Sequence, residues 1–149
     1  MATETMPLGV MSTTLICNQL RRDEGFRQFP YRDGRGVLTV GYGFNLESDG
    51  LSQTEAGTVL HLRVYTRYRE LVAALPWVLK LDLVRQAVLV NMAYNMGVHG
   101  LLEFAVTLTN VQAGDYEAAA DAMLKSTWAD QVGARAQRLA VQMRTGEWQ

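Results

Sequence analysis

Apolar residues recur at helical spacing along most of the chain. The first such segment, residues 12–24, places Leu15, Ile16 and Leu20 on one stripe, with Ser12 or Thr13 as its cap. Gly25 is a natural helix end, which puts a carboxylate at the last residue of the segment. Further helices are predicted over residues 53–75, 82–96, 101–109, 115–125 and 134–144.

Helix boundary signals support these ranges. Residues 52–55 read Ser-Gln-Thr-Glu, a capping box, and the helix that follows should end before Pro76. Residues 82–96 are apolar nearly all round, which predicts a buried central helix ending at Gly97 and Gly100. Asp115 is the expected cap of the helix over 115–125.

Residues 29–46 follow a different pattern, with glycines spaced among β-prone residues. The run from Asp33 to Gly36 is a turn signal between two short β-prone segments. We therefore expect a small hairpin or a three-stranded sheet here. Gly41 and Gly43 flank Tyr42, which indicates a place where the backbone is closely approached by a ligand or another strand.

Composition narrows the possible functions. The 149 residues carry a net charge of −1, which disfavours nucleic-acid binding through a basic face. Cys17 is the one cysteine, so an intramolecular disulfide is excluded, and we expect a buried, inert thiol. His61 and His99 lack ligand spacing around them, so we expect no metal site. Residues 1–20 read as neither a signal peptide nor a membrane span.

Three polar residues form the sharpest candidate site. Glu24 ends the first helix, where the negative end of the helix dipole opposes a negative charge. Asp33 lies at the hairpin turn, and Thr39 lies on the returning strand. Glycosidic cleavage uses two carboxyl groups in different environments, one protonated and one ionised. The spacing alone also fits a helix-end charge and an ordinary turn aspartate.

Several segments, in order along residues 13–149, carry a resemblance to phage-type lysozymes. They are residues 24–27 (Glu-Gly-Phe-Arg), 31–34, 38–43 (Leu-Thr-Val-Gly-Tyr-Gly), 85–97, 124–128, 135–138 and 144–148. The resemblance implies a mainly α, α+β lysozyme-like fold with a small β-sheet lobe and a larger helical lobe joined by a long helix. We expect one such domain over residues 1–149: the small lobe at about 25–60, the linking helix at about 53–75, and the helical lobe at 76–149 together with helix 13–24.

The resemblance also implies roles for individual residues. Glu24 resembles the general acid, Asp33 the base that activates water, and Thr39 the residue that holds this water. The implied reaction is an inverting hydrolysis of the β-1,4 bond between N-acetylmuramic acid and N-acetylglucosamine in peptidoglycan. An inverting enzyme keeps its two carboxyl groups about 6.5–9.5 Å apart.

Four further positions match substrate-binding or site positions of the family. Tyr94, Thr107 and Asn45 lie where the family contacts substrate, and Arg135 matches an arginine that pairs with the general acid. The chain departs from the family pattern in three places. Phe44 occupies a position that is histidine in a typical family member, Asn45 one that is leucine, and Ala122 one that is asparagine. These differences affect the details of substrate binding.

The resemblance implies an endolysin that binds peptidoglycan glycan strands and uses no cofactor. We expect a monomer without nucleic-acid partner or stable membrane anchor, held in the host cytoplasm until a holin-type route releases it to the cell wall. Two alternatives stay open. One is a lytic transglycosylase, which the presence of Asp33 disfavours; the other is a non-catalytic wall-binding module on a lysozyme scaffold.

Overall fold

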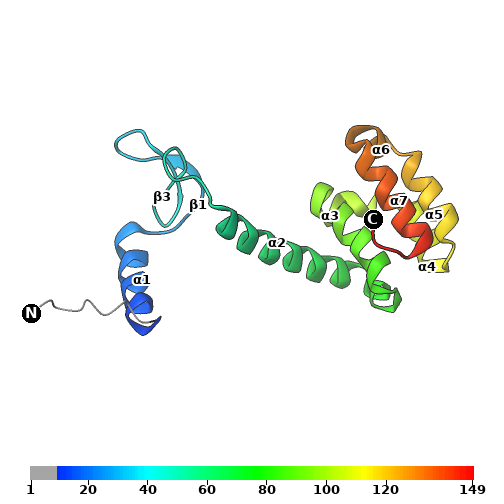
Figure 1. Ribbon diagram of the computed structural model, residues 1–149, viewed down its shortest axis with the longest axis horizontal. Helices are drawn as coiled ribbons and strands as arrows, with labels where there is room; N and C mark the ends of the chain where they lie inside the picture. The colour runs from blue at the N-terminus through cyan, green and yellow to red at the C-terminus, as the bar shows by residue number, and fades with distance from the viewer. Residues whose placement is uncertain (1–9) are drawn as a thin grey trace, which may run out of the picture. The chain divides into compact units, whose positions relative to one another are not determined.

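The computed structural model describes residues 10–149 (Figure 1). The chain divides into two compact units, one up to Gly57 and one from Thr58 onward. We call residues 10–57 the sheet unit and residues 58–149 the helical unit. The fold is α+β and mainly helical, with a small antiparallel sheet, as the sequence predicts.

The sheet unit contains α1 (Val10–Glu24) and three strands, β1 (Arg27–Arg32), β2 (Leu38–Gly41) and β3 (Phe44–Asn45). The strands are antiparallel in the order β1-β2-β3, which confirms the predicted three-stranded sheet. The pairing of β1 and β2 shifts between the pairs Arg27–Gly41 and Tyr31–Thr39. Pro30 lies in this irregular stretch, where the missing proline N–H costs no regular ladder bond.

The start of α1 differs from the prediction. The helix begins at Val10, so Ser12 and Thr13 lie inside it and are not its cap. Residues 1–9, including the first part of the segment without a signal pattern, lie outside the described residues. Cys17 is half-buried, so the expectation of a buried thiol was wrong. The neighbouring apolar residue Leu20 is exposed.

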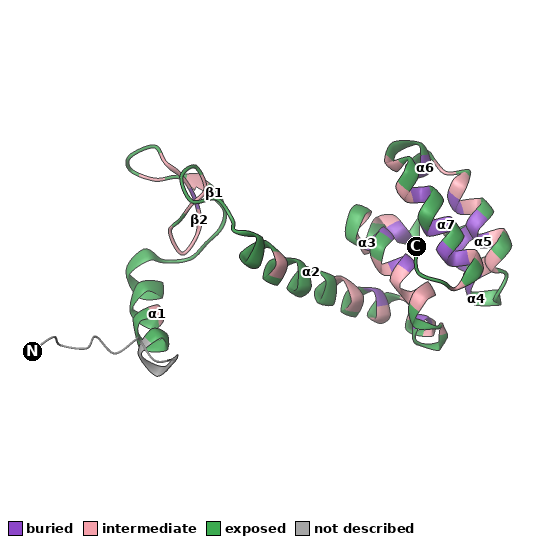
Figure 2. Cartoon of the chain, in the orientation of Figure 1, coloured by how far each residue is buried: buried purple, intermediate pink, exposed green. Residues whose placement is uncertain are grey.

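Helix α2 (Gln53–Ala74) begins at the predicted capping box. The Ser52 hydroxyl accepts a hydrogen bond from the Glu55 backbone N–H, and the Glu55 carboxylate accepts one from the Ser52 backbone N–H. The helix ends before Pro76, and a short 3-10 helix, η1 (Pro76–Lys80), follows it. Most of α2 is exposed, and Leu71 near its end is buried (Figure 2).

The remaining helices of the helical unit are α3 (Leu83–Leu102), α4 (Ala105–Ala113), α5 (Tyr116–Leu124), α6 (Thr127–Val132) and α7 (Ala134–Thr145). Gly97 interrupts α3 with φ 80° and ψ 159°, but the helix resumes and ends at Leu102 instead of at Gly100. The helix expected over 101–109 therefore starts later, as α4. Asp115 caps α5 as predicted, and its side chain accepts a hydrogen bond from the Ala118 N–H.

One apolar core lies among η1 and helices α3 to α7, with the end of α2. Its members include Leu89, Met92, Leu101 and Met143, which are fully buried (Figure 2). Burying one such side chain stabilises a fold by about 1.5–3 kcal/mol. Helix α3 is part of this core, as predicted, but Leu83 and Tyr94 are exposed, so residues 82–96 are buried on one side and not all round.

Polar contacts tie α3 to the end of α7. The Arg85 guanidinium donates hydrogen bonds to the carbonyls of Met143 and Arg144 at 2.8 Å each. These carbonyls belong to the last turn of α7, which has no intrahelical partners for them. Gly146 follows with φ 70°, and a Cβ there would lie 2.6 Å from the Arg85 guanidinium, so glycine makes this close contact possible.

No helix within residues 10–149 is both long and apolar enough to cross a membrane. The assignment of residues 13–24 to the helical lobe, and of the whole chain to one lysozyme-like domain, stays a prediction.

Candidate active site

Glu24 is the last residue of α1, as predicted, and Gly25 follows it with φ 68°. Its carboxylate lies against the turn between β2 and β3. A Cβ built on Gly43 would lie only 2.6 Å from the Glu24 Oε2 atom. Gly43 also has φ 78°, which favours glycine. The Glu24 carboxylate therefore occupies space that any side chain at position 43 would take.

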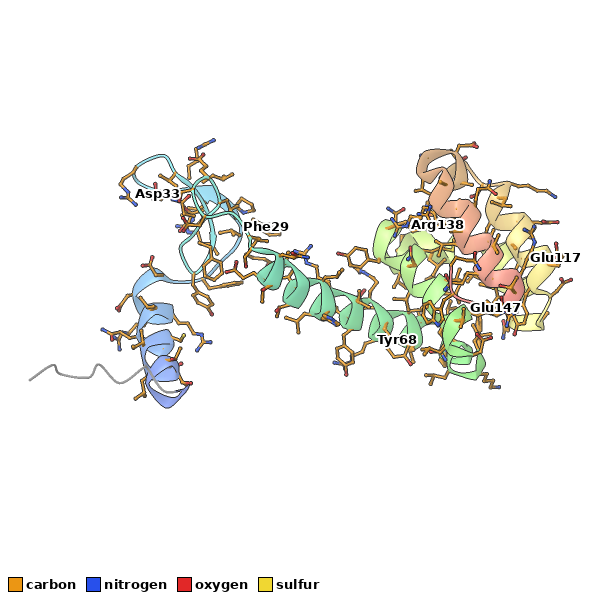
Figure 3. All side chains as sticks on the ribbon, viewed as in Figure 1. Phe29, Asp33, Tyr68, Glu117, Arg138 and Glu147 are labelled. Carbon is orange, nitrogen blue, oxygen red and sulfur yellow. The ribbon has the colours of Figure 1, made fainter. Side chains whose placement is uncertain are left out.

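Asp33 lies directly after β1, at the turn to β2 (Figure 3). Its Oδ1 atom accepts hydrogen bonds from the backbone N–H groups of Arg35 at 2.8 Å and Val37 at 2.9 Å. The Arg35 guanidinium lies 3.8 Å from Oδ2. The hydrogen bonds from Val37 and Arg35 hold the pKa of Asp33 below its ordinary value. Asp33 is therefore an ionised carboxylate at neutral pH.

Thr39 lies on β2 and is 5% exposed. Its hydroxyl donates a hydrogen bond to the Val37 carbonyl at 3.0 Å, and the Asp33 backbone N–H donates to the same carbonyl at 3.0 Å. Val37 thus bonds to both predicted residues, through its N–H to the Asp33 carboxylate and through its carbonyl to the Thr39 hydroxyl. A hydroxyl that donates in this way keeps its acceptor lone pairs for another partner.

The strand register relates these three residues. At one end of β2, Val37 is hydrogen-bonded to Asp33. At the other end, Gly41 pairs with Arg27, and Arg27 follows Glu24 by three residues. Four residues of extended strand span about 13 Å. Thr39 lies midway between them. The structure therefore brings the three predicted residues to one small sheet and the helix end that precedes it.

Asn45 lies on β3 and pairs with Thr39. Its side-chain Oδ1 accepts hydrogen bonds from the backbone N–H groups of Glu47 and Ser48 at 3.0 Å each. The residue predicted to contact substrate thus also stabilises the turn after β3. Asparagine is favoured in such turns because its side chain bonds the backbone two residues on.

Tyr94 and Arg135 line the same pocket of the helical unit. The pocket measures about 360 Å³ and is otherwise lined by Leu60, Val64, Ala87, Val90 and Asn91. Arg135 donates to the Asn91 side-chain oxygen at 2.9 and 2.7 Å and to the Asn91 carbonyl at 3.2 Å. Asn91 therefore fixes the guanidinium from α3, a role that the sequence analysis did not assign.

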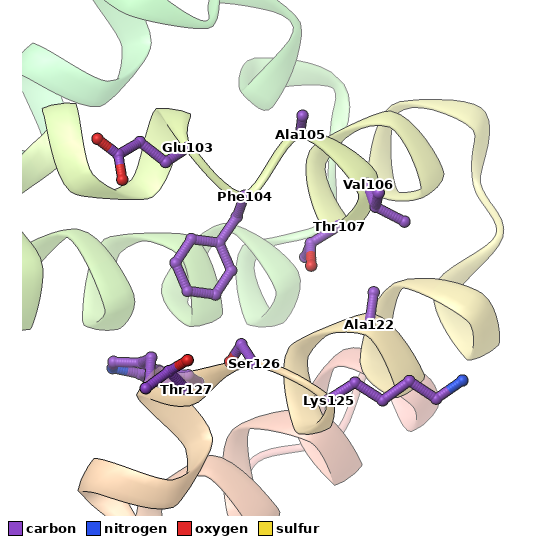
Figure 4. Close-up of a pocket in the computed structure, with 10 residues that line it drawn as sticks. Glu103, Phe104, Ala105, Val106, Thr107, Ala122, Lys125, Ser126 and Thr127 are labelled. Carbon is purple, nitrogen blue, oxygen red and sulfur yellow. The ribbon is translucent and has the colours of Figure 1, made fainter.

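Thr107 lies in a different pocket from Tyr94 and Arg135. This pocket measures about 490 Å³ and lies where α4 faces the segment that joins α5 and α6 (Figure 4). Phe104 and Trp128 also line it, with ring centres 6.1 Å apart and ring planes at 88°. Trp128 donates a hydrogen bond to Asn95 on α3 at 2.9 Å.

The pocket around Thr107 contains residues that the sequence analysis did not single out as site residues. Lys125 and Ser126 line it together with Ala122, the position where the chain departs from the family pattern. Ser126 caps α6 by accepting a hydrogen bond from the Ala129 N–H. A serine three residues before this N–H is a signal that could have predicted the start of α6, which the sequence analysis missed.

Within residues 10–149, no group of three or more histidine, cysteine, aspartate or glutamate side chains is arranged to hold a metal ion.

Comparison with known proteins adds to this geometry. A family model described as phage lysozyme matches residues 21–145. The chain belongs to the phage lysozyme family. Within that family match lie Glu24, Asp33 and Thr39, together with the pockets around Thr107 and Tyr94.

Two similar proteins place this member of the phage lysozyme family among known sequences. The pre-baseplate central spike protein Gp5 of Enterobacteria phage T4 is 28% identical over an alignment of 159 residues, which covers 88% of this chain. The chain spans only 28% of that spike protein's length. Probable T4-type lysozyme 1 of Dictyostelium discoideum is 28% identical over 160 residues, covering 88% of this chain and 94% of that protein.

Proposed function

We propose that this protein is an endolysin-type muramidase that hydrolyses the β-1,4 bond between N-acetylmuramic acid and N-acetylglucosamine in bacterial peptidoglycan. Membership of the phage lysozyme family supports this substrate class. The relative from Dictyostelium discoideum, which aligns over 94% of its length, carries the name lysozyme. The local geometry of Glu24, Asp33 and Thr39 supports a role for these residues in the reaction.

Glu24 acts as the general acid and gives its proton to the leaving oxygen of the glycosidic bond. Its position at the end of α1, with its carboxylate against the turn at Gly43, supports this role. Asp33 acts as the base, and the backbone N–H groups of Val37 and Arg35 keep it ionised by lowering its pKa.

The attacking water lies between Asp33 and Thr39 in this proposal. Asp33 takes one proton from the water, whose oxygen bonds to the anomeric carbon as the bond to the leaving oxygen breaks. Attack from the face opposite the leaving group inverts the configuration, so the β-linked substrate gives an α-product. We expect a separation of about 6.5–9.5 Å between the Glu24 and Asp33 carboxyl groups when substrate is bound.

The proposed substrate contacts are Asn45, Tyr94, Thr107 and Arg135. Tyr94 and Arg135 share a pocket, which supports a joint role, and Asn91 orients the Arg135 guanidinium. The reaction requires no cofactor, and the protein works as a monomer.

The hydrogen-bond link from Asp33 through Val37 to Thr39 is the observation that carries this proposal. It joins a carboxylate of lowered pKa to a hydroxyl at the site where a water would be activated. The experiment is lysis of purified peptidoglycan by Glu24→Gln, which should lose activity by about a hundredfold or more because the amide has no acidic proton. Glu47→Gln is the matched control, because Glu47 lies in the same unit and bonds to Arg32.

Glu47→Gln should lyse peptidoglycan as the unmodified protein does, and both variants should melt at the unmodified temperature. Full activity of a folded Glu24→Gln protein would refute the assignment of Glu24 as the acid.

A second candidate is a non-catalytic wall-binding module on a lysozyme scaffold, because one similar protein is a spike protein of phage T4. Binding of peptidoglycan without release of fragments would support it. A lytic transglycosylase is the third candidate, and its products would lack the added water, which mass spectrometry of released muropeptides detects. We further propose storage in the host cytoplasm and release through a holin-type route.

A further inference from the structure

The ring of Tyr42 lies beside residues that flank Glu24 in the sequence. Phe26, two residues after Glu24, has its ring centre 5.4 Å from that of Tyr42, with the ring planes tilted by 48°. The guanidinium carbon of Arg21, three residues before Glu24, lies 6.0 Å from the Tyr42 ring centre. Residues three apart on a helix are neighbours on its surface, so Arg21 and Glu24 share one side of α1.

The aromatic pair Phe26 and Tyr42 presents apolar surface to solvent. Phe26 is 64% exposed, and Tyr42 is half-buried. A tilted aromatic pair at this distance contributes about 0.5–1.5 kcal/mol to stability. This is less than a phenylalanine contributes when a core buries it fully. Packing between the two rings therefore leaves most of the Phe26 surface without a partner inside the sheet unit.

The pair also adjoins the carboxylate of the proposed acid. Tyr42 directly precedes Gly43, where an added Cβ would lie 2.6 Å from the Glu24 carboxylate. A sugar ring that offers its glycosidic oxygen to Glu24 would therefore have the two aromatic rings close by. The C–H groups on one face of a pyranose are apolar and slightly positive, which suits the negative face of an aromatic ring.

We propose that Phe26 and Tyr42 form a stacking surface for one sugar ring of the glycan strand, next to Glu24, with Arg21 supplying N–H donors for its polar edge. This inference rests on the proposed function, because it takes the glycan strand as the substrate of Glu24. The ligand class is an N-acetylated hexose in β-1,4 linkage. The pair would position the sugar and would not take part in the proton transfers.

The test uses the Glu24→Gln protein, which should bind glycan without cleaving it. We would titrate it with soluble glycan strands prepared from peptidoglycan and follow binding by calorimetry. Phe26→Leu keeps apolar bulk but removes the flat ring, and it should weaken binding by about three- to tenfold. Phe26→Trp keeps a flat ring and should restore the affinity.

Phe29→Leu is the matched control, because Phe29 is 73% exposed on β1 of the same unit. It should bind glycan with the affinity of the Glu24→Gln parent. In the active protein, Phe26→Leu should raise KM by about the same factor and leave kcat unchanged. If Phe26 had only a structural role, the substitution would instead lower the melting temperature of the protein.

Equal affinity of the parent and Phe26→Leu would overturn the stacking surface while leaving the proposed function intact. A parent that binds no glycan strand would overturn both proposals together. Equal weakening of glycan binding by Phe26→Leu and Phe29→Leu would also overturn the stacking surface, since any exposed phenylalanine would then have the same effect.

Discussion

The sheet unit and the helical unit differ in what stabilises them. In the helical unit, an apolar core runs through the end of α2, η1 and helices α3 to α7, and many of its side chains are fully buried. Among residues 13–57 of the sheet unit, Thr39 alone is buried. That unit depends on short strands, on glycines with positive φ, and on side chains that bond to turn backbone, as Asp33 and Asn45 do.

This difference shows why the proposed chemistry lies in the less buried unit. A carboxylate such as Asp33 stays ionised there because hydrogen bonds from backbone N–H groups lower its pKa. The same hydrogen bonds hold the turn. Asp33 is thus also a structural group of the sheet unit, whereas the helical unit supplies a core and the pockets around Thr107 and Tyr94.

The largest expected effect is on stability, when a buried leucine of the helical unit is truncated and compared with an exposed one. Leu101→Ala removes a fully buried side chain and should lower the free energy of unfolding by about 2–5 kcal/mol. Leu102→Ala, at the next position of α3 and 39% exposed, should cost less than about 1 kcal/mol. Chemical denaturation of both variants measures the difference.

Leu20→Ala in α1 extends this comparison to the sheet unit. Leu20 is 47% exposed, so we expect a cost close to that of Leu102→Ala. A cost as large as that of Leu101→Ala would mean that α1 has a buried face, as the prediction that groups residues 13–24 with the helical lobe requires.

A smaller effect on stability, but a strong one on activity, is expected from Gly43→Ala. The added Cβ would meet the Glu24 carboxylate and would force an alanine to φ 78°. We expect a loss of about 1–3 kcal/mol in stability and a fall in lysis of about tenfold or more, because the carboxylate must move.

Gly34→Ala is the control for this change. Gly34 lies in the neighbouring turn, where a Cβ would meet nothing within 4 Å, so the stability should change by less than about 0.5 kcal/mol. Similar losses of activity in the two variants would contradict the proposed contact between Gly43 and Glu24.

The smallest expected effect concerns pH. The folded protein lowers the pKa of Asp33 below its ordinary value of 3.8, so the ionised form contributes stability above pH 3.8. This contribution is lost as the pH falls through the lowered pKa. Asp33→Asn should therefore show a weaker dependence of stability on pH below about 4 than the unmodified protein.

The pH dependence of activity also reports on Asp33. If Asp33 is the base, the acidic limb of the pH–rate profile should lie below its ordinary pKa of 3.8. Asp49→Asn, in the loop after β3, should leave both the stability profile and this limb unchanged. If the acidic limb lies well above pH 4 and remains in Asp33→Asn, it reports the titration of another group.

Local signals in the sequence predicted much of the sheet unit. Gly25 marks the end of α1, residues 33–36 form the turn, and residues 52–55 form the capping box, because each depends on neighbours within a few residues. Gly41 and Gly43 are points of close approach, as predicted, but side chains approach them instead of a ligand or another strand. What approaches them, the Phe44 ring and the Glu24 carboxylate, follows from tertiary packing.

The errors also have physical reasons. Helix α1 begins before the residues that resembled a cap, since apolar helical residues precede them. At Gly97 the chain leaves the helical conformation for one residue and α3 then resumes, because Leu101 joins the core. The short helix α6 was missed because six residues carry too little periodicity to show as a helix.

The catalytic roles themselves came from family resemblance. The spacing of Glu24, Asp33 and Thr39 along the chain did not distinguish a glycosidase from a helix-end charge and a turn aspartate. The link through Val37 is a contact between side chains and backbone that no spacing rule predicts.

The central claim is that Glu24 and Asp33 cleave glycan strands with inversion. The most direct test is to digest purified glycan strands and to record the anomeric configuration of the new N-acetylmuramic acid ends by proton NMR within the first minutes. We predict that the α-anomer appears first and then equilibrates with the β-anomer. Initial release of the β-anomer, anhydro-muramyl ends, or no cleavage by the folded protein would contradict it.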